Sequence, residues 1–192
     1  EEAYKYFFNE QWRKIPALTI TRGMPNSVAN MIAIDSGLQG KNLTISNACN
    51  SSAEAIGTAF EQIQWGKMPI AICGGSESMI WESFMAAWCK LRVMSKQNEA
   101  PGTACRPFDK NRDGMVMADG AGILVLEDYD HAKARGAKPI AEIIGFDSSC
   151  DAFHITAPSV EGQVRAVQGA LDDAKVCPTD VQYINAHGTS TK

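Results

Sequence analysis

Short apolar runs alternate along this chain with segments of helical periodicity, and this alternation restricts the folds open to it. Strands are predicted by apolar runs at five places: residues 43–46, 69–73, 122–126, 140–146 and 181–186. Helices are predicted by the spacing of apolar residues at six places: residues 2–13, 24–34, 53–63, 81–91, 129–135 and 164–174. Strands and helices in this order predict the packed layers of an α/β fold.

The composition is that of a globular protein with a core, because 45% of the 192 residues are hydrophobic and 21% are charged. A net charge of −4 provides no electrostatic footprint for nucleic acid and argues against an anionic membrane. No apolar run approaches the ~20 residues that span a bilayer, and the polar start shows no signal peptide. The six cysteines are scattered without a CxxC pair, which argues against structural zinc and suits a reducing cytoplasm.

Cys49 has the most promising position for chemistry, between the predicted strand at 43–46 and the next predicted helix. Ser51 and Glu54 have the spacing of a capping box, with Ser51 as the N-cap residue. The positive end of a helix favours the thiolate over the thiol, and the thiolate is the nucleophile. We therefore predict that Cys49 is a catalytic cysteine rather than an inert one.

A second candidate, His187, ends the last predicted strand and is followed by Gly188, Thr189 and Thr191. Two threonines spaced by two on an extended loop face the same way, so they either bind a ligand's amides or close a turn. Cys49 and His187, at two strand ends, form the candidate active site. The other two histidines are interpreted as structural, for His154, and as solvated, for His131.

Residues 109–114 copy the first six positions of a calcium-binding loop, Asp-x-Asn-x-Asp-Gly. The twelfth position of such a loop is a bidentate Glu, but here it is Gly120, and Lys110 and Arg112 add positive charge. We therefore predict no metal and interpret the loop as a solvated or salt-bridged turn that braces the site.

Together these segments resemble the elongating β-ketoacyl-(acyl carrier protein) synthases of fatty acid and polyketide assembly. The family's signatures are matched, in order and spacing, by five segments: residues 47–51, 105–114, 119–127, 151–158 and 183–191. The first segment is similar to the active-site cysteine turn, and the last to the first catalytic-histidine motif. Asn50 departs from the small residue that usually follows the cysteine.

The resemblance implies a thiolase-like layered αβαβα fold that is incomplete at both ends of this chain. Residues 1–130 are expected to form the later part of the N-terminal half, and residues 131–192 the start of the C-terminal half, of one continuous catalytic domain. A lysine, a second catalytic histidine and a glycine-rich loop are then expected outside this chain. We therefore expect the isolated segment to be inactive.

The implied activity is a decarboxylative Claisen condensation, in which Cys49 carries the acyl group and His187 stabilises the enolate formed from malonyl-acyl carrier protein. The resemblance also implies that Thr156, Thr189 and Thr191 line the phosphopantetheine tunnel. No cofactor is implied beyond the phosphopantetheine of the carrier. The implied partners are acyl carrier protein, malonyl and acyl thioesters, and a second copy or a related subunit, without nucleic acid or membrane, in the cytoplasm.

Two alternatives stay open at this point. A coenzyme A-dependent thiolase also pairs a cysteine with a histidine on the same fold, although its signatures around the histidine differ. The chain also fits an inactive fragment or an interaction subunit of a condensing enzyme. The motifs leave the acyl chain length and the choice between fatty acid and polyketide pathways open.

Overall fold

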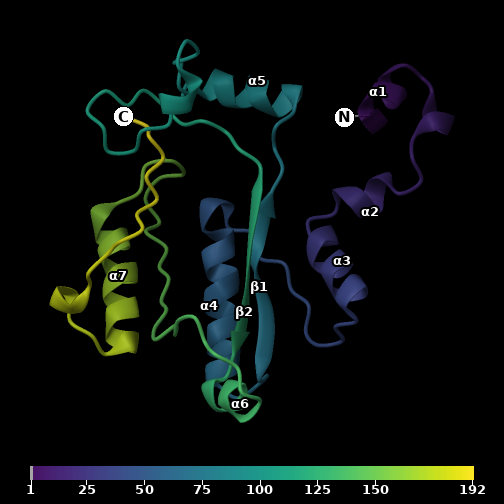
Figure 1. The fold of residues 1–192 in the computed structure, drawn as a ribbon. Helices are drawn as coiled ribbons and strands as arrows, with labels where there is room; N and C mark the ends of the chain where they lie inside the picture. Colours follow the sequence, from purple (N-terminus) through teal and green to yellow (C-terminus); the bar gives the residue numbers. More distant parts are fainter. Residues whose placement is uncertain (1) are drawn as a thin grey trace. The chain divides into compact units, whose positions relative to one another are not determined.

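The computed structural model describes residues 2–192, so that Glu1 lies outside the description, and the chain divides into two units, Glu1–Ala48 and Cys49–Lys192. The longer elements, labelled in Figure 1, are α1 (Glu2–Phe8), α2 (Thr19–Gly23), α3 (Ser27–Ser36), α4 (Ser51–Gln64), β1 (Ile70–Glu77), α5 (Glu82–Leu91), β2 (Gly120–Glu127), α6 (Tyr129–Ala134) and α7 (Val160–Ala174). Short 3₁₀ turns are η1 (Trp12–Lys14), η2 (Ala48–Asn50), η3 (Pro101–Thr103) and η4 (Pro178–Asp180).

The first unit is helical, but its first helix is shorter than predicted. The sequence predicts one helix over residues 2–13, whereas α1 ends at Phe8. The chain then turns through Glu10, which has a positive φ of 54°. This turn brings the Trp12 ring into a stacked arrangement with Phe7, with 6.1 Å between ring centroids. The aromatic contact accounts for the early end of the helix, because a continuous helix does not bring residues five apart face to face.

The second unit is built around an antiparallel pair of strands, in which Ile70 of β1 lies opposite Glu127 of β2 and Glu77 lies opposite Gly120. Helix α4 packs against this pair. The fit is close where Gly75 faces Ser52, since a Cβ added to this glycine would overlap the serine side chain. The start of α4 therefore lies at the end of β1, and the helix runs back along the strand (Figure 1).

Three predicted strands, residues 43–46, 140–146 and 181–186, belong to no strand of the described chain. A strand is defined by backbone bonds to a neighbour, and the described sheet contains β1 and β2 alone. Segment 140–146 contacts helices instead. The Phe146 ring lies on Gly57 of α4, and its N–H donates to the Asp173 carboxylate of α7 at 2.9 Å.

The core is much smaller than the composition predicts. The buried hydrophobic residues of the described chain are Cys73, Ala104 and Ala132. Apolar side chains of β2 stay in contact with solvent, and Val125 is 60% exposed. The physical reason is the sheet itself, because two strands and one packed helix cover few apolar side chains. Burial raises the pKa of the Cys73 thiol.

An ion-pair cluster joins the end of β2 to α6. The Glu127 carboxylate accepts hydrogen bonds from Arg135 Nε at 2.7 Å and from Arg135 Nη2, and His131 Nδ1 lies 2.6 Å from Glu127 Oε1. The Asp128 carboxylate caps the helix by accepting the His131 backbone N–H at 3.0 Å. The hydrogen bond from Arg135 is the main reason why the pKa of Glu127 falls to about 2, with His131 adding to the effect and burial opposing it.

This shift predicts a pH-dependent stability. The folded-state pKa of Glu127 is depressed, so its contribution is complete above the ordinary carboxyl range and is lost as the pH falls toward about 2. We expect the melting-temperature difference between the unsubstituted protein and Glu127→Gln to be constant from pH 7 to pH 5 and to shrink below that. The control is Glu99→Gln, an exposed carboxylate, which should show no such trend. A difference that persists undiminished at pH 2.5 would contradict the assignment.

Candidate active site

The turn before α4 places Cys49 at the start of the second unit. Ala48 adopts a positive φ of 48°, in the left-handed region that residues with a Cβ rarely occupy, and the η2 turn spans Ala48–Asn50. The Cys49 side chain is exposed. Residues held in this region cluster at functional sites, where the surrounding structure maintains the strain. The geometry therefore presents the sulfur to solvent at a helix N-terminus.

The predicted capping box, with Ser51 as the N-cap residue and Glu54 as its reciprocal partner, is wrong. Helix α4 begins at Ser51, which makes Asn50 the N-cap residue, with no cap hydrogen bond from its side chain. Asn50 Nδ2 instead donates to Glu54 Oε1 at 3.0 Å. Asn50, the residue that departs from the family pattern, thus hydrogen-bonds with Glu54. In the predicted capping box the Glu54 side chain would instead accept the backbone N–H of the cap residue.

The His187 segment lies outside the helices and strands of the described chain, and its anchor is a serine that the sequence does not single out. The His187 side chain is exposed, whereas Ser190 is 2% exposed and is the buried polar side chain of the described residues. Ser190 has a positive φ of 64°. Its Oγ accepts the Arg106 backbone N–H at 3.0 Å, and its carbonyl oxygen accepts the Gly114 N–H at 3.0 Å. The histidine segment therefore rests on the loop that contains residues 105–114.

Two further contacts hold the same two segments together. Arg112 Nε donates to the Thr191 carbonyl oxygen at 2.7 Å. A Cβ added at Gly188, where φ is +50°, would lie 3.2 Å from Pro107 Cβ and 3.4 Å from the Phe108 ring. The position after the histidine therefore combines a left-handed backbone with close packing, which explains why glycine is suited to it.

The loop that resembles a calcium site is an ion-paired turn. Arg106 Nη2 lies 3.1 Å from Asp113 Oδ1, and the other donors to Asp113 are the Ser95 hydroxyl at 2.8 Å and the Lys96 N–H at 3.0 Å. The Ser95 hydrogen bond is the largest of several effects that lower the pKa of Asp113. Asp109 Oδ1 accepts the Asn111 N–H at 2.6 Å. These carboxylates stabilise the loop on which the histidine segment rests.

The structure brings two of the three predicted tunnel threonines together. The Thr189 and Thr191 hydroxyl oxygens lie 2.7 Å apart, so both face the same side of the segment, as the spacing predicts. Thr156 is exposed and contacts His154, whose Nδ1 accepts the Thr156 N–H at 3.1 Å. The interpretation of His154 as structural stays a prediction, since its side chain is exposed and its contact with Thr156 is local. In the described part of the chain, Thr156 hydrogen-bonds with His154 and not with the other two threonines.

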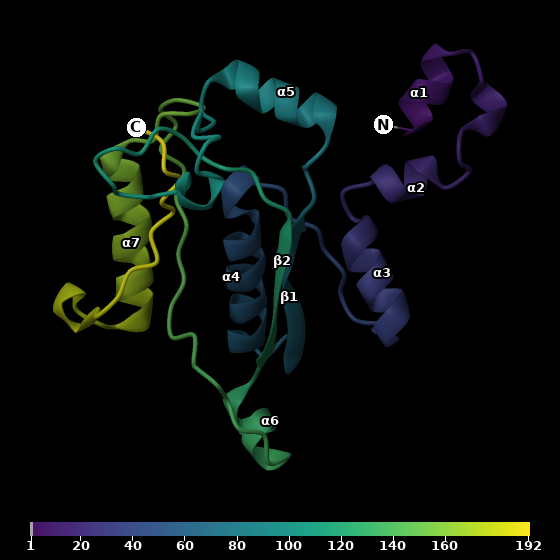
Figure 2. The ribbon, with the colours of Figure 1, turned by 45° about the horizontal axis from the view of Figure 1, so that its top comes forward.

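The segments of Cys49 and His187 lie at the same end of the second unit. Ser52 places the start of α4 beside the end of β1. Asp119, which precedes β2, accepts the Met79 N–H at 2.7 Å and the Ile80 N–H at 3.2 Å, so both strands meet there. In Figures 1 and 2 the C-terminal segment runs along α7 and ends beside the teal loop, at the end of the second unit opposite α6. The assignments of Cys49, His187 and the three threonines remain predictions.

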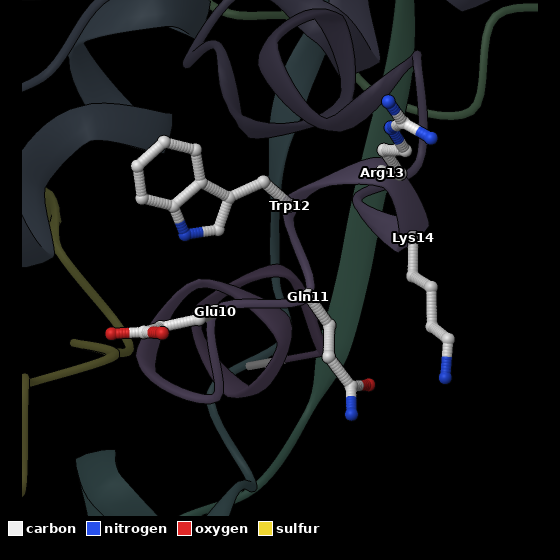
Figure 3. A pocket seen from close by; sticks show the side chains of 5 residues that line it. All are labelled: Glu10, Gln11, Trp12, Arg13 and Lys14. Carbon is white, nitrogen blue, oxygen red and sulfur yellow. The ribbon is translucent and has the colours of Figure 1, made fainter.

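Two shallow hollows lie elsewhere. One follows α1 in the first unit and is lined by Glu10, Gln11, Trp12, Arg13 and Lys14. Figure 3 shows the Trp12 and Glu10 side chains on one side of this turn and Arg13 and Lys14 on the other. The second hollow, formed by residues 150–155, lies directly before Thr156. Among the described residues, no helix has the length and apolar character needed to cross a membrane.

Comparison with known proteins establishes the class. The β-ketoacyl synthase N-terminal domain matches residues 2–132, and the β-ketoacyl synthase C-terminal domain matches residues 140–192. The chain belongs to the β-ketoacyl synthase family. Among curated relatives, 3-oxoacyl-(acyl-carrier-protein) synthase 2 of Vibrio harveyi is 43% identical over 93% of this chain and 44% of its own length. The chain thus spans about half the length of the curated relatives it matches.

Solved structures confirm the predicted thiolase-like α/β fold. A β-ketoacyl synthase from Burkholderia phymatum is 38% identical, with a TM-score of 0.92 over 100% of this chain and 47% of the other. A second match is a chain of a structure described as a type II polyketide synthase acyl-carrier protein in complex with its ketosynthase bound to the hexaketide. That chain is 34% identical to this one. Its TM-score is 0.89 over 94% of this chain and 45% of that one. The two-stranded sheet and its helices are therefore part of the ketosynthase architecture.

Proposed function

We propose that the complete protein containing this chain catalyses the condensation of an acyl group on Cys49 with malonyl-acyl carrier protein, to form β-ketoacyl-acyl carrier protein. The observation that carries the proposal is the shared location of two segments in the second unit. The cysteine turn begins α4, and the histidine segment is tied to the 105–114 loop at the same end. Membership of the β-ketoacyl synthase family supplies the reaction class.

The first step is acyl transfer. The Cys49 thiolate attacks the carbonyl carbon of an acyl thioester on the carrier, and the bond from this carbon to the carrier sulfur breaks. The proton that Cys49 has lost ends on the departing phosphopantetheine sulfur. The backbone N–H of Cys49 is a candidate donor to the oxyanion formed on the way. Exposure of the sulfur leaves it accessible to the incoming thioester.

The second and third steps are decarboxylation and condensation. The bond between the malonyl carboxylate and the α-carbon breaks, carbon dioxide leaves, and the electron pair forms an enolate on the thioester. A neutral His187 imidazole donates a hydrogen bond to the enolate oxygen and stabilises the charge that develops there. The enolate carbon then attacks the acyl-Cys49 carbonyl, and the Cys49 sulfur leaves as thiolate.

The threonines are assigned to the phosphopantetheine arm. The paired hydroxyls of Thr189 and Thr191 present hydrogen-bonding groups beside the histidine segment, and Thr156 presents a third from the segment after residues 150–155. This chemistry requires no cofactor beyond the arm carried by the substrates. Acyl carrier protein is the proposed partner, since the hexaketide-bound ketosynthase is in complex with one. A dimer, with a second copy or a related subunit, and a cytoplasmic location belong to the same proposal.

The test compares carriers for the same acyl and malonyl groups, with the full-length protein. We expect condensation with malonyl-acyl carrier protein, and a higher kcat/KM for acyl groups on carrier protein than for the same groups on coenzyme A. Carrier protein without its phosphopantetheine arm is the matched control. It cannot hold an acyl group, so Cys49 should not be acylated in its presence. Thiolysis of a β-ketoacyl-coenzyme A without condensation would indicate a thiolase. Absence of any acylation would indicate an interaction subunit.

A further inference from the structure

Arg112 makes a contact that the proposed mechanism does not use. Its side chain is half-buried, and its guanidinium bridges two backbone carbonyls: Nε donates to Thr191 at 2.7 Å and Nη1 donates to Asp109 at 3.0 Å. The two carbonyls lie on segments that are about eighty residues apart in sequence. A guanidinium is planar and holds its donors in a rigid fork, so it fixes the distance between the segments as well as joining them.

The segment that Arg112 contacts contains an unfavourable backbone conformation, which needs support from the surrounding structure. Ser190, directly before Thr191, has a positive φ of 64°. A residue with a side chain keeps such a conformation only where its surroundings impose it. At Ser190 the hydrogen bonds come from the backbone N–H groups of Arg106 and Gly114, whereas Arg112 supplies the side-chain bond from the loop to the segment.

The course of this segment determines where His187 lies. The histidine is exposed and precedes Ser190 by three positions, and Gly188, which is packed closely against Pro107, lies between them. The position of the imidazole therefore depends chiefly on the position of the Thr189 backbone. The Thr189 hydroxyl is in turn paired with the hydroxyl of Thr191. Movement of the Thr191 carbonyl is thus transmitted to the histidine through the three residues between them.

We propose that Arg112 is a positioning residue for His187. Its hydrogen bond to the Thr191 carbonyl holds the backbone of the histidine segment in the conformation that places His187 for catalysis. The inference deepens the proposed function and rests on it for the consequence in catalysis. Arg112 itself touches neither substrate nor the reacting atoms. A displacement of about 1 Å in a catalytic group lowers a rate by about 100-fold, which sets the scale of the effect.

The experiment uses the full-length protein and compares Arg112→Ala with Lys110→Ala. Lys110 lies on the same loop, carries the same charge, is exposed, and has no described hydrogen bond or ion pair, so it is a matched control. We expect Arg112→Ala to lower kcat for malonyl-carrier decarboxylation by about 100-fold with little change in KM. Acylation of Cys49 should stay near that of Lys110→Ala, since Cys49 is on another segment. Ethylguanidinium in solution should restore part of the decarboxylation in Arg112→Ala alone.

A second measurement does not depend on activity. Amide hydrogen exchange of residues 187–191 should become at least about tenfold faster in Arg112→Ala and stay unchanged in Lys110→Ala, because the lost bond releases this segment. Equal decarboxylation by the two variants, or acylation that falls together with decarboxylation and melting temperature, would overturn the positioning role. If the unsubstituted protein neither acylates Cys49 nor decarboxylates, the proposed function is wrong. The exchange rates then decide the positioning role by themselves.

Discussion

Replacement of Cys49 by alanine is expected to abolish acyl transfer while leaving the chain folded. The sulfur is the proposed nucleophile, and removal of the nucleophile costs about 10⁶-fold in kcat in a serine protease that also forms an acyl-enzyme. The side chain is exposed, so its loss leaves no cavity in a packed core. Decarboxylation of malonyl-carrier does not need the sulfur and should be retained in part. The measurement is the mass of the intact full-length protein after incubation with acyl-carrier.

The matched control for this experiment is Cys89→Ala. Cys89 lies on α5, is also exposed, and has no role in the proposed mechanism. The Cys89→Ala variant should become acylated at Cys49 at the rate of the unsubstituted protein. Chain elongation that continues in Cys49→Ala would show that another group carries the acyl chain. A Cys49 thiol that does not react with iodoacetamide near neutral pH would instead favour the interaction-subunit alternative.

Replacement of His187 by alanine is expected to separate the two halves of the reaction. Acylation of Cys49 should proceed, whereas decarboxylation and condensation should fall by about 10²–10³-fold. This factor corresponds to about 2.7–4 kcal/mol of transition-state stabilisation from a single oxyanion donor. Intact-protein mass after acyl loading, together with carbon dioxide release from malonyl-carrier, measures both halves on one sample.

The control for His187→Ala is the same substitution at His131. His131 lies on α6 at the opposite end of the second unit, where it contacts Glu127. His131→Ala should decarboxylate at the ordinary rate, with any cost limited to stability. An unacylated Cys49 in His187→Ala would contradict the division of roles, since the imidazole would then be needed to generate the thiolate. Normal decarboxylation in that variant would contradict its role as enolate donor.

The helices of this chain could be predicted from sequence more fully than its strands. Apolar spacing identifies α4 and α5 to within a few residues, because a helix forms its backbone bonds within itself. Segments 140–146 and 181–186 have the apolar pattern of strands but are not paired in the described sheet. Pairing depends on a neighbour that local pattern does not reveal. Phe146 instead contacts Gly57, a contact between positions far apart in the sequence.

The candidate site shows the same division. Local context is enough to propose Cys49 and His187, as a cysteine before a helix and a histidine before Gly188, and both assignments stay predictions. The anchor of the histidine segment was missed, because Ser190 bonds to a backbone N–H 84 residues away. Its position between two threonines was the available signal. The positive φ of Ala48 was missed as well, because alanine rarely adopts that conformation and carries no sequence sign of it.

The close packing of Phe146 on Gly57 means that the border between the two family regions is not a physical seam. Phe146 belongs to the C-terminal region and Gly57 to the N-terminal region, in the helix that begins beside Cys49. The Ser190 hydroxyl oxygen also accepts the Arg106 backbone N–H across the same border. A hybrid that joins the two regions from distant synthases is therefore expected to lose stability, because both of these contacts would have to fit foreign residues at once.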